Sequence, residues 1–109
     1  MNKQKQGKAN RAKGHNLERV VCKILRERGY TAETARYASR KHDDLGCDVM
    51  TSAPLSIQCK SSTRLSVPVH DLLKQMAANG LDNPAVVHQR PNKGMVISMT
   101  LEDLLELLQ

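Results

Sequence analysis

Apolar residues between positions 15 and 28 recur every three or four residues along the chain. The spacing i, i+3, i+4, i+7 and i+8 is met by Leu17, Val20, Val21, Ile24 and Leu25. Such spacing places side chains on one face of a helix. Gly29, which comes directly after this stretch, is suited to the residue that ends a helix. We therefore predict a helix over about residues 15 to 28.

One carboxylate lies at the edge of this apolar stripe. At about 100° per residue, Glu18 lies within roughly 60° of Val21 and 20° of Leu25 around the helix axis. A carboxylate so close to buried side chains needs a partner. Glu18 is therefore expected to face another polar group at the boundary of the core.

The rest of the chain alternates between strand and helix patterns. Strands are predicted at residues 30–37, 47–51, 55–60, 85–88 and 95–99, with a polar loop at 38–46 and a turn at 52–54 that makes a hairpin. In the third strand, alternation sends Ile57 and Cys59 to one face and Ser56, Gln58 and Lys60 to the other.

Two more helices are predicted. Pro68 opens one whose apolar positions are Val69, Leu72, Leu73 and Met76, and Asn79-Gly80 ends it. Thr100 and Asp103 form a capping box for a last helix rich in leucine. These leucines favour either burial in the core or dimerisation. The order of elements predicts an α/β domain with a mixed central β-sheet flanked by helices.

Charge is distributed unevenly along the 109 residues, whose net charge is +6. Residues 1 to 41 hold 12 basic and 3 acidic groups, whereas residues 42 to 109 hold 5 and 8. A basic half attracts nucleic acid through its phosphates, although a merely solvated surface is the alternative. Residues 1–13 are predicted to be a disordered basic arm, and residues 14–109 to be the folded domain.

Composition limits the kinds of partner that we expect for this chain. The chain has two aromatic residues, Tyr30 and Tyr37, so we expect it to bind nucleic acid by the backbone rather than by base stacking. It lacks a long apolar run and a secretory signal, and this predicts a cytoplasmic protein without membrane association. Its three cysteines have no metal-type spacing and are expected to be small buried apolar residues.

Three oxygen-bearing side chains on successive predicted elements could meet at one edge of the sheet. Glu18, Asp48 and Gln58 offer the oxygen ligands that Mg²⁺ prefers, and Mn²⁺ can substitute. Lys60 is suited to orienting a water or offsetting charge in a transition state. Each residue alone has a structural alternative, such as an ion-paired boundary residue or the wet face of an edge strand.

The arrangement of these residues resembles a known nuclease family. It comprises Gly14-His15-Asn16-Leu17-Glu18-Arg19 opening a helix, Arg36 and Ser39 before a polar loop, Asp48, and Ile57-Gln58-Cys59-Lys60-Ser61. Over roughly residues 14–109, this resembles the archaeal-type Holliday junction resolvases of the PD-(D/E)XK superfamily. The resemblance implies a restriction-endonuclease-like fold and a homodimeric, Mg²⁺-dependent endonuclease that cuts paired strands of a four-way DNA junction.

The resemblance also implies roles for single residues. Glu18 and Asp48 become metal ligands, Lys60 the catalytic lysine, and Ser39 a residue near the scissile phosphate. Gln58 stands in place of the second motif acid, and the candidate metal-binding set is Glu18, Asp48, Gln58 and the adjoining Cys59. The candidate DNA-binding residues are Lys8, Arg11, Lys13, Arg19, Arg36, Arg40 and Lys41.

Two positions depart from the family pattern. Cys47 replaces the proline that precedes the motif acid, and Gln58 removes one negative charge, which weakens cation binding. Asp43 or Asp44 could compensate from the loop, unless both are simply solvated. Two alternatives to a junction resolvase therefore remain: a catalytically silent DNA-binding protein on the same fold, and a nuclease that acts on other DNA structures.

Overall fold

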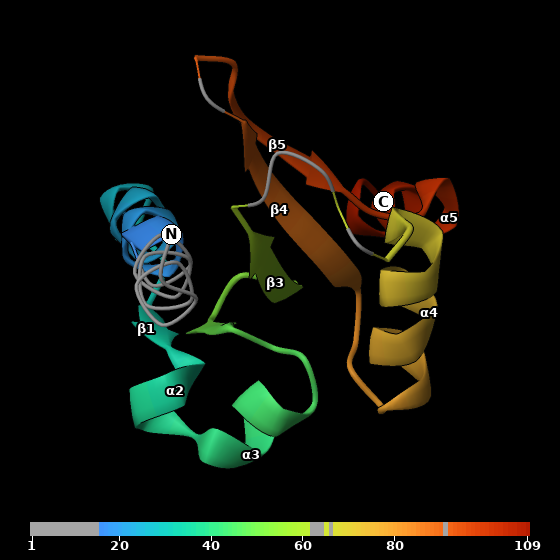
Figure 1. Ribbon diagram of the computed structural model, residues 1–109, viewed down its shortest axis with the longest axis horizontal. Helices are drawn as coiled ribbons and strands as arrows, with labels where there is room; N and C mark the ends of the chain where they lie inside the picture. The colour runs from blue at the N-terminus through green and yellow to red at the C-terminus, as the bar shows by residue number, and fades with distance from the viewer. Residues whose placement is uncertain (1–15, 62–64, 66, 91) are drawn as a thin grey trace, which may run out of the picture.

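The computed structural model describes residues 16–61, 65, 67–90 and 92–109 (Figure 1). Five strands form one sheet in the order β1-β2-β3-β4-β5, in which β3 and β4 run parallel and every other pair is antiparallel. The strands are β1 (Ala32–Thr34), β2 (Val49–Thr51), β3 (Ser56–Lys60), β4 (Pro84–Arg90) and β5 (Gly94–Ser98). The predicted mixed α/β sheet is confirmed.

The helix at residues 16–27 covers one face of this sheet. Leu17 and Val21 are buried against strand residues that include Ile57 and Val87, and Leu25 packs against the same cluster. Gly29 has φ +94° and follows the last turn, as predicted. Val20 and Ile24 are 43% and 39% exposed, because the apolar stripe of this helix is wider than its contact with the sheet.

The opposite face of the sheet is covered by α4 (Val69–Ala78). Its residues Leu72, Leu73 and Met76 are buried together with Val86 of β4. Since neighbours in a strand point to opposite faces, Val86 and Val87 contribute to different clusters. Figure 1 shows α4 and helix 16–27 on opposite sides of the sheet.

Two predictions between residues 30 and 46 were wrong in detail. The first strand covers only Ala32–Thr34 and is followed by α2 (Ala35–Ala38). The expected loop contains α3 (Arg40–Asp44), whose N-cap Ser39 accepts a hydrogen bond from the His42 N–H. Helices of one turn are too short to produce a periodic apolar pattern, so the sequence pattern did not reveal them.

The remaining elements follow the sequence pattern. The predicted hairpin pairs Val49 of β2 with Ile57 of β3, and Gly80 ends α4 at φ +85°. The Thr100 hydroxyl caps α5 (Leu101–Leu107) by accepting a 3.2 Å hydrogen bond from the Asp103 N–H. All three cysteines are free and buried, as expected.

Some predictions concern residues outside the described part of the chain. The basic arm at residues 1–13, with Lys8, Arg11 and Lys13, lies outside the described residues. Among the described helices, none is long and apolar enough to cross a membrane.

Candidate active site

Asp48 lies where β2 and β3 begin to separate. Its backbone N–H donates to the Ile57 carbonyl at 2.7 Å, and its own carbonyl accepts from the Ala35 N–H at 2.9 Å. Its side-chain Oδ2 accepts a 2.8 Å hydrogen bond from the Cys59 N–H. The carboxylate therefore takes the place of a strand carbonyl, and β2, β3 and α2 together fix its position.

Glu18 reaches the same region from helix 16–27. Its side chain is 12% exposed, and its Oε2 lies 3.9 Å from the Arg36 Nη2. The pKa of Glu18 is raised to about 7, mainly by burial and also by the Asp48 carboxylate, whereas Arg36 opposes the shift. This confirms the prediction that Glu18 is a boundary carboxylate facing polar groups.

The pKa of Asp48 is also raised, to about 6. Burial is the main cause, and the nearby Asp43 adds to it, while the Cys59 N–H and Lys60 lower the value. Two acids that are both buried and close to each other are harder to ionise. The site thus concentrates negative charge that the fold alone does not neutralise.

Gln58 projects from β3 with its two amide atoms in different surroundings. A Cβ atom added to Gly46 would lie 3.3 Å from the Gln58 Nε2, and Gly46 itself has φ +95°. The Gln58 Oε1 is buried and has no hydrogen-bond partner among the described residues. Gly46 therefore allows the amide nitrogen to approach closely, and the amide oxygen is left available for a ligand.

The sequence does not show whether Asp43 or Asp44 could add negative charge to the site, whereas the structure distinguishes the two residues. The Asp43 carboxyl lies close enough to Asp48 to raise the pKa of that residue. Its carbonyl accepts from the Gly46 N–H at 3.1 Å, which closes the turn between α3 and Asp48. Asp44 is exposed, so Asp43 is the residue placed to add negative charge.

Other candidate residues take different positions. Ser39 caps α3, and its hydroxyl lies 2.8 Å from the His42 Nδ1. The Cys59 side chain belongs to the buried cluster under helix 16–27, and burial raises the pKa of its thiol. Strand alternation turns the thiol toward the core, and the nearby Asp48 and Glu18 carboxylates contribute to the rise in its pKa. The N–H of Cys59 donates to Asp48, and a metal-binding role for Cys59 stays a prediction.

The candidate DNA-binding residues divide into two groups. Arg19, on helix 16–27, and Arg40 and Lys41, on α3, are exposed. Arg36 is 23% exposed and faces Glu18, so its first contact is with the candidate site rather than with open solvent.

The polar atoms fit a hard divalent cation. Among the described residues, no three His, Cys, Asp or Glu side chains form a metal-binding group, so the acids need a further donor, such as the Gln58 amide, to hold a cation. Glu18 Oε2 and Gln58 Oε1 are buried without hydrogen-bond partners in the described part of the chain. Carboxylate and amide oxygens are the ligands that Mg²⁺ and Mn²⁺ accept.

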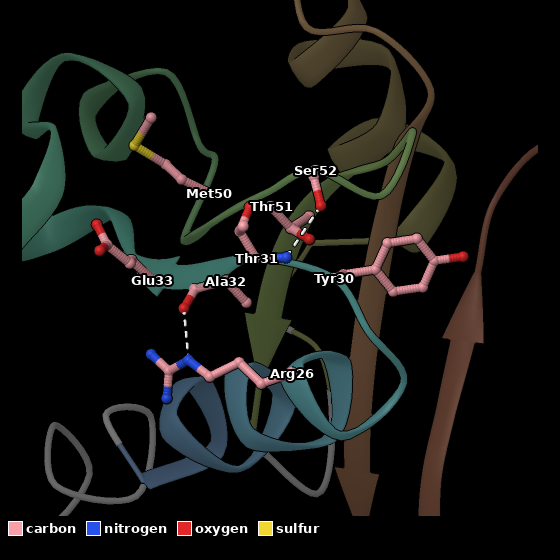
Figure 2. Close-up of a pocket in the computed structure, with 8 residues that line it drawn as sticks. All are labelled: Arg26, Tyr30, Thr31, Ala32, Glu33, Met50, Thr51 and Ser52. Atoms are coloured by element: carbon pink, nitrogen blue, oxygen red, sulfur yellow. Dashed lines mark hydrogen bonds between the residues drawn. The ribbon is translucent and has the colours of Figure 1, made fainter.

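A separate hollow lies away from these residues in the described part of the protein. It measures about 720 Å³ and lies beside β1 and the end of β2 (Figure 2). Arg26 Nε donates there to the Ala32 carbonyl at 2.8 Å, and the Thr31 N–H donates to the Ser52 hydroxyl at 2.9 Å. Its lining contains none of the candidate catalytic residues.

Comparison with known families identifies one matching family model. Residues 9–100 match the family model Mrr_cat, which describes a restriction endonuclease. The chain belongs to this restriction endonuclease family. The mixed five-stranded sheet with flanking helices is compatible with the fold that the family indicates, and membership supports a nuclease whose substrate is DNA. Searches of curated proteins and of solved structures gave no match.

Proposed function

We propose that this restriction endonuclease family member is a metal-dependent DNA endonuclease whose catalytic residues are Glu18, Asp48, Gln58 and Lys60. One observation carries the proposal. Two partly buried carboxylates with raised pKa values lie near a lysine, together with a buried amide oxygen that has no hydrogen-bond partner among the described residues. Crowded, poorly neutralised acids are costly to a fold, and such clusters concentrate at functional sites.

Each residue has a distinct role in this proposal. Glu18, Asp48 and the Gln58 Oε1 would hold Mg²⁺ or Mn²⁺. When bound, the cation supplies positive charge to the scissile phosphate and activates water for attack. Lys60 offsets charge that develops in the transition state. Arg36 positions Glu18 through their 3.9 Å ion pair.

Asp43 completes the charge of the site. Replacement of the motif acid by Gln58 leaves two ligand carboxylates, and Asp43 contributes a third negative group through its contact with Asp48. In this role Asp43 acts through Asp48 and is a positioning residue.

The proposed substrate is branched DNA, in particular a four-way junction. The resemblance of the motifs to junction resolvases supports this choice. Basic residues outnumber acidic ones by 12 to 3 over residues 1 to 41, and such charge favours contacts with phosphates over contacts with bases. A protein that reads backbone geometry selects DNA by shape.

The working unit is proposed to be a homodimer, because two symmetric sites suit a nearly symmetric junction. The support is the apolar surface of β5 and α5, which consists of Met95, Val96, Ile97, Leu101, Leu104, Leu105 and Leu108. These residues are 37–73% exposed, which is a large amount of apolar side chain to leave in contact with water.

The dimer is tested by measuring mass in solution with light scattering. Wild type should have twice the mass of one chain, and Leu101→Lys/Leu108→Lys should be monomeric. Val20→Lys, at an exposed apolar position on helix 16–27, is the matched control and should remain dimeric. A monomeric wild type would contradict the proposed dimer.

The proposed compartment is the cytoplasm. All three cysteines are free and buried, and unpaired thiols are typical of proteins in reducing compartments.

Cleavage is tested on synthetic four-way junctions, flaps and linear duplexes of equal length, with Mg²⁺ or Mn²⁺ at fixed salt. Junctions should be cut fastest, and Asp48→Asn should abolish cutting while retaining binding. No cleavage with either metal would rule out the nuclease, and equal cutting of linear duplex would rule out selectivity for branched DNA.

Gln58 favours a second candidate function, a DNA-binding protein that has lost catalysis. Gln58→Glu separates the two, because it restores the motif acid at the same position. If glutamine is a working ligand, the substitution changes cleavage by less than about tenfold or lowers it. A silent wild type that gains cleavage in this variant would show that the site has decayed.

A further inference from the structure

The hairpin of β4 and β5 carries a second polar site, on the sheet face that α4 covers. A groove of about 430 Å³ opens there, and we name it the hairpin groove. Its lining residues are His88, Arg90, Lys93, Gly94, Val96 and Ser98. The turn that joins the two strands projects away from α2 and α3 (Figure 1).

The hairpin groove is positive in a part of the chain that is otherwise acidic. Residues 42 to 109 hold 5 basic and 8 acidic groups, yet residues 84 to 98 contain Arg90 and Lys93 and no carboxylate. Both cations are exposed, and the Lys93 N–H donates to the Arg90 carbonyl at 3.2 Å. The tight turn therefore holds the two charged residues close together, and within the described part of the chain neither forms an ion pair with an acid.

His88 forms the inner wall of the groove. Its Nε2 is buried and has no hydrogen-bond partner among the described residues. Burial and the nearby Arg90 lower its pKa, so the ring is neutral at pH 7. A neutral imidazole can donate one hydrogen bond to an anionic oxygen. The groove thus combines two permanent cations with a buried nitrogen that lacks a partner.

The strand next to the groove carries Lys60 of the candidate active site. Lys60 of β3 pairs in register with His88 of β4, and residues two apart share a face, so Lys60, His88 and Arg90 project to the same side. Strand spacing and rise place the Cα atoms of Lys60 and Arg90 roughly 8 Å apart. A line of positive and hydrogen-bonding groups therefore runs from the catalytic lysine to the hairpin turn.

We propose that the hairpin groove binds backbone phosphates of the DNA next to the phosphate at Lys60. This deepens the proposed function, on which it rests for the identity of the ligand. The residues that line the groove include no Phe, Tyr or Trp for base stacking, so the ligand is recognised by its phosphodiester charge.

The test measures DNA binding without cleavage. Full-length Asp48→Asn protein is titrated against a labelled four-way junction in EDTA, at several salt concentrations between 50 and 300 mM. Adding Arg90→Ala/Lys93→Ala should lower the slope of log K against log salt by about 1 to 2, as expected for the loss of one or two phosphate contacts. Affinity at 100 mM salt should fall about 5- to 20-fold.

The matched control also removes two positive charges, but from the other face of the sheet. Lys23 and Arg28 are exposed on or just after helix 16–27, and Lys23→Ala/Arg28→Ala should change the slope by less than half as much. Arg90→Lys/Lys93→Arg should restore binding. Equal losses in both alanine variants, or no loss in the hairpin variant, would overturn the proposal.

Two further measurements are needed. One distinguishes DNA phosphate from free phosphate as the ligand, and the other distinguishes failure of the groove proposal from failure of the nuclease proposal. Inorganic phosphate at 10 mM, with ionic strength held constant, should not displace the junction; full displacement would assign the groove to free phosphate instead. In metal-active protein, the hairpin variant should raise KM with kcat within about threefold. Normal cleavage with an unchanged KM would reject the groove alone, whereas absent cleavage with the expected loss of binding would reject the nuclease alone.

Discussion

The carboxylate cluster (Glu18, Asp43 and Asp48) and the hairpin groove lie on neighbouring parts of one sheet, but they differ in the sign and the burial of their charges. In the cluster, burial and mutual repulsion raise the pKa values of Glu18 and Asp48 to about 7 and about 6. In the groove, the permanent cations Arg90 and Lys93 are exposed, and only the neutral His88 is drawn inward.

The difference shows where the protein accepts an energetic cost. Exposed cations cost little, because water solvates them. Buried acids beside one another destabilise the fold unless a cation or a proton neutralises them. The cluster is therefore the region in which function outweighs stability, while the groove contributes long-range attraction at little cost.

The largest effect is expected from a substitution in the carboxylate cluster. Asp48→Asn should lower the cleavage rate at least ~1,000-fold, since it removes the charge of a proposed metal ligand. DNA affinity should change less than about threefold, because the candidate phosphate contacts lie elsewhere. Single-turnover cleavage and anisotropy binding measure the two quantities. A comparable loss of affinity would mean that Asp48 is needed for binding rather than for chemistry.

A second change tests how closely Gln58 is packed. Gly46→Ala should destabilise the protein by about 2–3 kcal/mol, because a side chain is strained at φ +95° and would press on the Gln58 amide. Gly80→Ala is the control, with φ +85° and nothing within 4 Å of the added Cβ. It should cost about 1 kcal/mol, from backbone strain alone. Equal losses in urea unfolding would show that the Gln58 contact is unimportant.

The pH dependence of stability should reveal the cluster directly. The folded state holds a proton on Glu18 up to about pH 7, whereas an ordinary glutamate ionises near 4.5. The folded state thus binds more protons in this window, so the metal-free protein should lose on the order of 2 kcal/mol of stability as pH rises from 4.5 to 7. Urea unfolding at several pH values measures this loss.

Glu18→Gln should flatten this slope, and saturating Mg²⁺ should do the same in wild type. An unchanged slope in the variant would mean that Glu18 is not the titrating group.

The smallest effect is expected in the groove and has the opposite sign. The pKa of His88 is lowered below 6.5 by burial, so the unfolded chain takes up a proton before the folded protein does. This residue should therefore reduce stability as pH falls through and below 6.5, by less than the Glu18 effect. His88→Gln should remove that contribution, measured as the change in Tm between pH 7 and 5. A larger acid loss in the variant would contradict the neutral, buried ring.

The sequence by itself determined the features that follow a periodic pattern and the residues that cap helices. Apolar periodicity located helix 16–27 and α4, alternation separated the buried Cys59 from Gln58, and the pairing of Thr100 with Asp103 marked the start of α5. These features depend on neighbours within a few residues, so they can be read from the order of the chain.

Tertiary structure decided what depends on distant contacts. The one-turn helices α2 and α3 have no period to detect, and only their folding shows that Asp43 rather than Asp44 meets Asp48. The pairing of Lys60 with His88 arises because β3 and β4, 28 residues apart along the chain, lie parallel in register. Charge on a sheet is arranged by such non-local pairing, which is why the hairpin groove emerged only from the fold.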